Sequence, residues 1–543
     1  MDSVKASLRD VIREALEVLE YRDIVYCDPH AKKWKSSLKR NDVIETPFGE
    51  VAFVSLRAID GVACGSHESG HAFLQGGLIV RNDEGNYCIS SPASTSHDEN
   101  AILPAWNEPP DEDIVPTPRG GKRDAIDLRG CFVEANDMRY LCSPLSGNYF
   151  VLKLNLSGNH LNDASAMLLA AAIGVNGALE ELILSYNDIN ADGSIALVQC
   201  LKTNARLRHL DLSHNHIGTV GLRAWLTLKQ NHTLEALLLS HNRDIQDNGG
   251  VDILHAISNE PLSLHDQAKL DLLVKSSTVK YLPDLLHEPS NASICMLSLS
   301  EVGLSTQSAK RLALVIETNQ VLAMLDVSMN KFADESNLLI ATALGQNKTL
   351  KRLHYAANPL CDAAAAAMAA SLATHPALAW ADFSGCFFGA SAGTELAALL
   401  RHNQALTSLD LSGGNLDPPG IVALCKSIGD NTTLQTLELT SSGLKSDTVV
   451  AVLAHALEKN STLTSLHLGY NKITLRGCKL LKDAIQANKT CKLTEETLLL
   501  EGNSGVNRKA SRETMKIVAL SPVDKGRKLC CIKDRYYDTF GPQ

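Results

Sequence analysis

A leucine pattern returns about every 28 residues along most of this 543-residue chain. Its clearest copies have the form Leu-x-x-Leu-x-Leu-x-x-Asn and begin at Leu179, Leu207 and Leu463. Self-similarity at a fixed period of this length is typical of a solenoid, in which each repeat packs only against its neighbours. The pattern therefore predicts a stack of similar repeats rather than one globular core.

Fourteen copies of the pattern can be counted, most of them 28 residues after the preceding copy. They begin at Arg123, Val151, Leu179, Leu207, Leu234, Gln267, Ile294, Leu322, Leu350, Leu378, Leu406, Leu434, Leu463 and Glu495. Longer intervals before Gln267 and Glu495 predict insertions of about five and about four residues. The copies at Arg123, Gln267 and Glu495 begin with polar residues, but each keeps the apolar alternation of a short strand.

The period of the apolar residues changes inside each repeat. The first part alternates apolar and polar residues over about six positions, which predicts a strand. The second part, such as Gly193 to Leu201, spaces apolar residues at three and four, which predicts an amphipathic helix. The chain should therefore form an α/β solenoid with parallel strands on the concave face and helices on the convex face. Leucines on the strands should be fully buried, namely Leu182, Leu210, Leu409 and Leu466.

Most copies close with an asparagine whose short amide can hydrogen-bond the backbone of neighbouring turns. These closing residues are Asn159, Asn187, Asn215, Asn242, Asn330, Asn358, Asn471 and Asn503, with cysteine at Cys131 and Cys386. Stacked asparagines should therefore join one repeat to the next. The sequons at Asn231 and Asn460 lie at repeat junctions, so we interpret them as junction chemistry rather than glycan sites.

The leucine pattern, the 28-residue period and the Asn-x-Thr-Leu junctions at Asn231, Asn347 and Asn431 resemble the ribonuclease-inhibitor-like leucine-rich repeat family. The resemblance is to the version found in NOD-like receptor tails and in several cytoskeletal and axonemal proteins, and it covers roughly Arg123 to Asn507. It implies a horseshoe of about 14 strand-helix repeats. It also implies a non-catalytic protein-protein interaction scaffold, a subunit of a large cytoskeletal or axonemal assembly, because this family mostly supplies binding surfaces.

The rest of the chain has a different character, so the sequence predicts four segments in all. Residues 1–93 should form a small α+β module with a helix over Ser3–Leu19 and strands at 51–56, 77–80 and 86–89. Residues 94–122 are rich in proline, acid and glycine and predict a linker. The repeats occupy 123–507, and a basic tail follows over 508–543.

Composition indicates a cytoplasmic protein without a cofactor. No apolar run reaches the length of a membrane span, and the N-terminus is charged rather than signal-like. The 14 cysteines are scattered, which favours reduced thiols. The formal net charge of -10 argues against general nucleic-acid binding. A cytoskeletal or flagellar (cilium) location follows from the family resemblance alone.

Acidic residues recur at the predicted concave position between the second and third leucines of the pattern. They are Asp127, Asp211, Asp271, Asp326, Asp382, Asp410 and Glu438. Larger groups expected on the same strand face are Tyr186, His214, His241, Met329, His354, Trp380, His467 and Tyr470. The acids are either plain repeat consensus or a surface for a basic protein partner, and the larger groups are candidate interface anchors. The candidate partner-binding residues are Asp211, Asp326, His354, Trp380, Asp382, Asp410, Glu438, His467 and Tyr470.

One string in the N-terminal module could hold a metal. His67-Glu68-Ser69-Gly70-His71 fits His-Glu-x-x-His, in which two imidazoles on one helix face bind Zn²⁺ while the glutamate polarises water. The string also resembles the metal site of membrane-linked AAA proteases. Glycines in and around the motif favour a short or broken element, and no ATPase module or third ligand accompanies it. We therefore expect a turn without metal, with a structural site and a zinc metallohydrolase as alternatives.

A regulator of a small GTPase is the other alternative, because Ran-type GTPase activators use similar repeats. The strongly acidic tail expected of such a protein is not found here. The chain also has no Gly-x-x-x-x-Gly-Lys-Ser/Thr string. The sequence thus favours a binding protein over an enzyme.

Overall fold

The structure is a computed structural model. It describes residues 125–258, 260 and 293–503, apart from residues 132, 134, 150, 415 and 495, together with six strands between residues 42 and 90. The chain divides into two compact units, Met1–Leu360 (unit 1) and Cys361–Gln543 (unit 2).

The N-terminal strands form two small antiparallel sheets. They are β1 (Asp42–Thr46), β2 (Gly49–Arg57), β3 (Val62–His67), β4 (Ala72–Phe73), β5 (Leu78–Arg81) and β6 (Tyr87–Ser90). One sheet has the order β1-β2-β3-β4 and the other pairs β5 with β6. The strands expected at 51–56, 77–80 and 86–89 agree with β2, β5 and β6. The helix predicted over residues 3–19, the linker and the tail lie outside the described residues.

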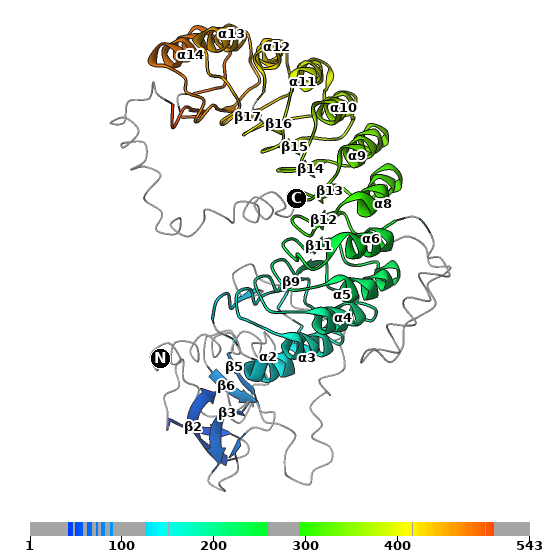
Figure 1. The fold of residues 1–543 in the computed structure, drawn as a ribbon. Coiled ribbons are helices and arrows are strands. Elements are labelled where there is room, and N and C mark those ends of the chain that lie inside the picture. The colour runs from blue at the N-terminus through cyan, green and yellow to red at the C-terminus, as the bar shows by residue number, and fades with distance from the viewer. Residues whose placement is uncertain are drawn as a thin grey trace. The chain divides into compact units, whose positions relative to one another are not determined.

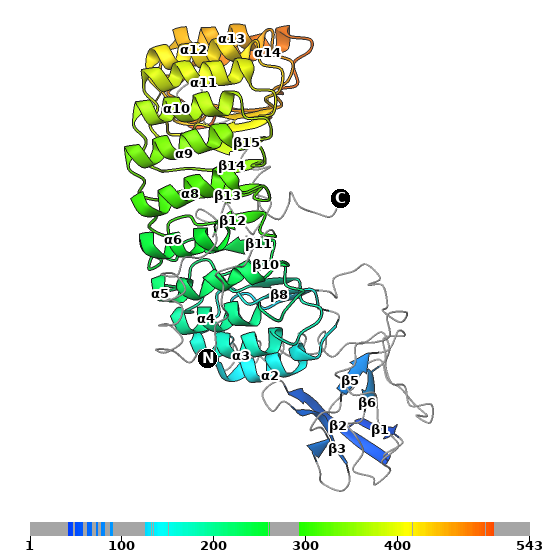
Figure 2. The same cartoon turned by 90° about the vertical axis from the view of Figure 1, so that its right-hand side faces the viewer.

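Parallel strands and helices alternate through the rest of unit 1, with the helices along one side of the strands (Figures 1 and 2). The strands are β7 (Ala125–Asp127), β8 (Lys153–Asn155), β9 (Glu181–Ile183), β10 (His209–Asp211), β11 (Ala236–Leu238), β12 (Met296–Ser298), β13 (Met324–Asp326) and β14 (Arg352–His354). The helices are α2 (Ala135–Ser146), α3 (Asp163–Ile173), α4 (Ala191–Cys200), α5 (Thr219–Arg223), the 3₁₀ helix η2 (Ala224–Gln230), α6 (Gln246–Ala256), α8 (Thr306–Thr318) and α9 (Asp334–Gln346).

Unit 2 repeats the same alternation. Its strands are β15 (Trp380–Asp382), β16 (Ser408–Asp410), β17 (Thr436–Glu438), β18 (Ser465–His467) and β19 (Leu498–Leu499). Its helices are α10 (Asp362–Ala373), α11 (Ala390–His402), α12 (Pro418–Ile428), α13 (Asp447–Leu457) and α14 (Leu475–Ala487). Leu466 of β18 pairs with Leu498 of β19, 32 residues later, which agrees with the insertion predicted before Glu495.

The core lies between the strands and the helices of each unit. Leu182 and Leu210 face each other in register on β9 and β10 and are 0% and 1% exposed. Leu409 and Leu466 are 0% exposed. The predicted burial of these leucines and the predicted parallel α/β solenoid are confirmed.

Each described strand of the parallel sheet is shorter than the sequence pattern suggested, two or three residues rather than about six. The residue just before the closing position of each repeat has a positive φ, so the chain turns there instead of continuing as a strand. This turn position holds Gly130, Gly158, Tyr186, His214, His241, Glu301, Met329, Ala357, Gly385, Gly413, Ser441, Tyr470 and Gly502. The prediction that Tyr186, His214, His241, Met329 and Tyr470 lie on strands is therefore wrong. A side chain other than glycine costs about 1–2 kcal/mol in this conformation.

The prediction that a repeat beginning at Gln267 adds a strand to the parallel sheet is also wrong. Ala236 of β11 pairs directly with Met296 of β12, so no strand lies between them in the ladder. The sequence count was misleading because Leu270-x-Leu272 alternates, whereas both signature positions of that copy are polar, Gln267 and Lys275. Asp271 belongs to the same segment, which lies outside the described residues.

A buried lysine contacts the backbone just after helix α6. Lys229 of η2 is 0% exposed, and its Nζ donates to the carbonyl oxygens of Ser258 (3.0 Å) and Glu260 (2.9 Å). Burial lowers the pKa of Lys229 to about 8. These contacts stabilise the backbone carbonyls beyond the end of α6, where no further helical turn satisfies them.

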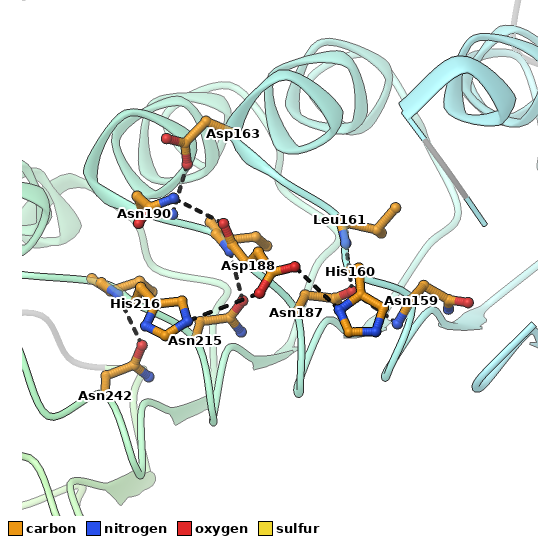
Figure 3. Close-up of polar contacts among 12 residues, drawn as sticks. Asn159, His160, Leu161, Asp163, Asn187, Asp188, Asn190, Asn215, His216 and Asn242 are labelled. Carbon is orange, nitrogen blue, oxygen red and sulfur yellow. Dashed lines mark hydrogen bonds and ion pairs between the residues drawn. The ribbon is translucent and has the colours of Figure 1, made fainter. Parts of the chain in front are cut away.

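The closing asparagines form the expected ladder between repeats (Figure 3). Asn187 Nδ2 donates to the carbonyl oxygens of Leu156 (3.0 Å) and Leu184 (2.9 Å). Its Oδ1 accepts from the backbone N–H groups of Asn159 (3.1 Å) and Leu161 (2.9 Å). One buried amide therefore satisfies backbone groups of two successive repeats.

A second asparagine ladder runs along the helix-to-strand junctions. Asn231 is 5% exposed, and its Nδ2 donates to the carbonyl oxygen of Leu201 (2.8 Å). Its Oδ1 accepts from the backbone N–H groups of Thr233 (3.1 Å) and Leu234 (2.8 Å). This agrees with the interpretation of the Asn-x-Thr-Leu strings as junction chemistry.

His375 takes the place of asparagine in this second ladder. It is 2% exposed, and its Nδ1 accepts from the backbone N–H groups of Ala377 (3.3 Å) and Leu378 (3.0 Å). An accepting Nδ1 requires a neutral ring with its proton on Nε2. Burial correspondingly lowers the pKa of His375 to about 4.

The ladder of closing asparagines predicts that removing a single amide side chain strongly reduces stability. Replacing Asn187 with leucine leaves buried backbone groups without partners, so we expect the free energy of unfolding to fall by about 3 kcal/mol. Urea denaturation measures this. Asn190→Ala is the control, since Asn190 is exposed and its Nδ2 donates only to the Asp188 carbonyl among the contacts described. Equal losses in the two variants would contradict the special role of the ladder position.

The second ladder predicts a pH effect. The unfolded chain binds a proton at His375 near pH 6.5, whereas the folded chain does so only near pH 4. The stability contribution of this residue is therefore complete above about pH 6.5 and is lost as the pH falls toward about 4. Asn at this position does not titrate, so His375→Asn should gain stability over the wild type in urea denaturation at about pH 5 relative to about pH 7.5. Parallel pH profiles of the two proteins would refute this assignment.

Candidate functional site

The His67-Glu68-x-x-His71 string does not begin on a helix. His67 ends strand β3, and Ser66 pairs antiparallel with Ala72 of β4. A zincin site needs both histidines on one continuous helix, which a strand at His67 does not provide. Glu68 and His71 lie outside the described residues. Within the described residues, no group of three or more His, Cys, Asp or Glu side chains could hold a metal ion, and no helix is long and apolar enough to cross a membrane.

Three residues expected on the accessible concave face are buried. Asp211, Asp326 and His354 are 2%, 1% and 8% exposed. Asp326 Oδ1 accepts from the Ser328 backbone N–H (3.0 Å), and its Oδ2 accepts from Ser298 Oγ (2.8 Å). The expectation that these three side chains are accessible to a partner is therefore wrong. Asp211 and Asp326 support the repeat-consensus interpretation, in which aspartate caps the turn after its strand.

Four other predicted residues lie side by side in unit 2, and we call them the acid-histidine row: Asp382, Asp410, Glu438 and His467. They are aligned in register on four adjacent strands, as Asp382 with Asp410, Asp410 with Glu438, and Glu438 with His467. All four are half-buried. Asp410 Oδ1 also accepts from the Ser412 backbone N–H (2.8 Å), so it keeps the consensus turn contact as well.

The row concentrates negative charge in a partly desolvated place. Adjacent strands lie about 4.8 Å apart, so in-register carboxylates repel one another. Burial, together with the neighbouring carboxylates of Asp382 and Glu438, raises the pKa of Asp410 to about 7. At neutral pH the Asp410 carboxyl in the middle of the row is therefore partly protonated.

The histidine ends the row, and two aromatic residues accompany it. His467 Nδ1 lies 3.7 Å from Glu438 Oε2, and its Nε2 lies 3.0 Å from Ser465 Oγ. Trp380 is half-buried on β15, two residues before Asp382 and therefore on the same strand face. Tyr470 is 62% exposed at its turn position. These residues combine an aromatic surface with carboxylates.

A row in unit 1 was not recognised from the sequence. Asp188 Oδ2 lies 3.2 Å from His160 Nδ1, and Asp188 Oδ1 lies 3.9 Å from His216 Nε2 (Figure 3). The three residues directly follow closing asparagines of successive repeats, so their 28-residue spacing was the available signal. Two residues before Asp188 and His216 in the chain, Tyr186 and His214 form a ring stack, although the sequence predicted them only as separate anchors.

Comparison with known families supports the repeat assignment. A family model described as leucine-rich repeat matches residues 147–170, 178–198, 203–224, 230–254, 402–425 and 459–482. The chain is a leucine-rich repeat protein. The matched segments fall on the strand-helix repeats described above, which also show the leucine-rich repeat fold directly. Among curated protein sequences, none matches this leucine-rich repeat protein significantly.

Solved structures with similar folds are distant. The yeast Rad7 and Elc1 complex has a chain that is 17% identical, with 70% of this chain and 79% of that chain covered and a TM-score of 0.39. An internalin from Listeria monocytogenes is 17% identical, with coverages of 68% and 86% and a TM-score of 0.37. The leiomodin-1 actin-binding site 2 is 18% identical, with coverages of 28% and 80% and a TM-score of 0.21.

The acid-histidine row predicts an unusual pH dependence of stability. The folded-state pKa of Asp410, about 7, lies above its ordinary value of 3.8, so the folded chain binds more protons between these pH values. The free energy of unfolding contributed by Asp410 should therefore fall as the pH rises from about 4 to about 7. Asn can still accept from Ser412, so Asp410→Asn should be more stable than the wild type at about pH 8, by on the order of 2 kcal/mol.

Chemical denaturation at about pH 5 and about pH 8 measures this difference. The control is Asp430→Asn, because Asp430 is exposed and lies outside the row. A wild type that remains as stable as Asp410→Asn at the higher pH would contradict the repulsion inferred for the row.

Proposed function

We propose that this leucine-rich repeat protein is a non-catalytic protein-interaction scaffold whose acid-histidine row binds a basic segment of a partner protein. The observation that carries the proposal is the in-register alignment of Asp382, Asp410 and Glu438, half-buried beside Trp380. Repeat consensus alone does not account for this alignment. In unit 1, the consensus aspartates Asp211 and Asp326 are buried instead.

Electrostatics supports a basic partner. Crowded carboxylates repel one another in the unbound protein, and a lysine or arginine side chain placed among them would replace that repulsion by attraction. Binding would also release the proton that Asp410 holds near neutral pH. Trp380 would supply an aromatic surface against which a cationic side chain can pack.

The wider setting is proposed on the family resemblance of the sequence. We infer a repeat of the ribonuclease-inhibitor-like type, supported by the 28-residue period and by the α-helix found in most repeats. We further propose a cytoplasmic protein in a large cytoskeletal, axonemal or flagellar assembly, arranged as an N-terminal module (1–93), linker (94–122), solenoid (123–507) and tail (508–543). No specific observation favours the GTPase regulator, and the strand at His67 does not favour the metallohydrolase.

The proposal predicts salt-sensitive capture of a basic probe. A short fluorescent peptide of alternating Gly and Lys should bind the full-length protein, and the triple variant Asp382→Asn, Asp410→Asn, Glu438→Gln should bind it at least about tenfold more weakly. The dependence of affinity on salt between about 0.05 and 0.3 M should also become flatter in the variant. Fluorescence anisotropy measures both quantities.

A matched control removes the same charge elsewhere in unit 2. Asp430→Asn, Glu458→Gln and Asp483→Asn neutralise three exposed acids outside the row. This control should bind the peptide within about twofold of the wild type, because exposed charges outside the row contribute little. Equal weakening in the two triple variants would mean that only net charge matters, and the proposed site would be rejected.

A further inference from the structure

Three aromatic rings form a continuous column in unit 1. The ring centroids of Tyr186 and His214 are 3.8 Å apart with planes inclined by 12°, and those of His214 and His241 are 3.9 Å apart with planes inclined by 14°. Each ring comes from the turn position of one repeat. Three successive repeats therefore stack their rings along the same edge of the sheet. We call Tyr186, His214 and His241 the aromatic column.

The column uses a backbone conformation that favours glycine. Tyr186, His214 and His241 have φ values of 57°, 55° and 60°. The two preceding repeats have glycine at the same position, Gly130 and Gly158, so the turn itself requires no ring. Residues held in this region against their conformational preference are concentrated at functional sites.

The two ends of the column differ. At one end, His241 Nδ1 lies 2.6 Å from Glu301 Oε2, and Glu301 also forms an ion pair with Arg243. At the other end, Tyr186 is 43% exposed, and the preceding turn residue, Gly158, has no side chain. Even a Cβ added at Gly158 would meet only the backbone of Gly130, at 3.8 Å and 3.9 Å. The Tyr186 end of the column is therefore accessible from solvent, next to a repeat that carries no side chain at the same position.

A carboxylate follows shortly after Tyr186 in the chain. Asp188 follows Tyr186 by two residues, its side chain is 49% exposed, and Figure 3 shows it between His160 and His216. A flat aromatic face together with a carboxylate recognises a planar cation, because guanidinium stacks on rings and donates to carboxylates at the same time. A phosphate-bearing group fits less well, since Asp188 would repel it.

We propose that the aromatic column and Asp188 form a second binding site, which takes an arginine side chain of a partner polypeptide. The guanidinium stacks on Tyr186 over Gly158 and donates to the Asp188 carboxylate. All of these residues belong to unit 1, so the site does not depend on the acid-histidine row.

Two peptides of equal charge test the proposal with the full-length protein. One alternates Gly with Arg and the other alternates Gly with Lys, and both carry a fluorescent label. The wild type should bind the arginine peptide about five- to tenfold more tightly, because stacking adds to the charge attraction that both peptides share. Tyr186→Gly should remove this preference, and its binding of the lysine peptide should change by less than about twofold.

The stability of the variant separates loss of the site from loss of the fold. Glycine relieves the positive φ at Tyr186, so Tyr186→Gly should melt no lower than the wild type. Ala357→Gly is the matched control, because Ala357 occupies the same turn position in another repeat of unit 1 with a φ of 52° and carries no ring. It should keep the full arginine preference. Asp188→Asn should weaken the arginine peptide by at least about threefold.

Other outcomes would overturn the proposal. Equal affinity of the wild type for both peptides, or an arginine preference that survives in Tyr186→Gly, would show that no guanidinium stacks there. Tight binding of a short oligothymidine that is lost in Tyr186→Gly would assign the column to nucleobases instead. The triple variant of the acid-histidine row should lose affinity for both peptides and keep the arginine preference, so the two sites can fail independently.

Discussion

The amide side chain of the closing asparagine is the interaction on which the repeats depend. The turn after each strand contains buried backbone N–H and C=O groups that have no backbone partner within their own repeat. Asn187 satisfies groups of its own repeat and of the preceding one, and Asn215 and Asn242 do the same in later repeats. Because each amide needs a neighbour on a fixed side, the ladder sets the register in which repeats stack. The buried leucines then supply the apolar contact that this register brings together.

Functional potential arises where side chains depart from what stacking requires. The turn position works with glycine, yet three successive repeats carry Tyr186, His214 and His241 there. The strand position works with a turn-capping aspartate, yet Asp410 lies between two further carboxylates and has a pKa raised to about 7. Both arrangements cost folding stability, through backbone strain in one case and charge repulsion in the other. Such costs are reasonable where a bound partner relieves or uses them.

Prediction from the sequence succeeded where the physical signal was periodic. The 28-residue spacing, the leucine positions and the asparagine ladder each recur many times, so single deviations did not obscure them. It failed where one short segment had to be judged alone. The alternation Leu270-x-Leu272 looked like a strand, but the direct pairing of Ala236 with Met296 leaves no place for it in the ladder. The length of the strands was also overestimated, since alternation in the sequence does not reveal a turn with positive φ.

The sequence by itself determined the parallel α/β solenoid, the residues of its core and the amides that join its repeats, because each of these follows from a local pattern repeated at a fixed period. Only the tertiary structure decided which polar residues are accessible. Asp326 and Asp410 occupy the same position of the same repeat pattern, yet the first is 1% exposed and the second is half-buried beside two carboxylates. Asp326 accepts a hydrogen bond from Ser298 of the preceding repeat, whereas the strands on both sides of Asp410 carry carboxylates at the same register position. Neither set of neighbours is encoded in the repeat that carries the aspartate, because each repeat contacts others about 28 residues away in the chain.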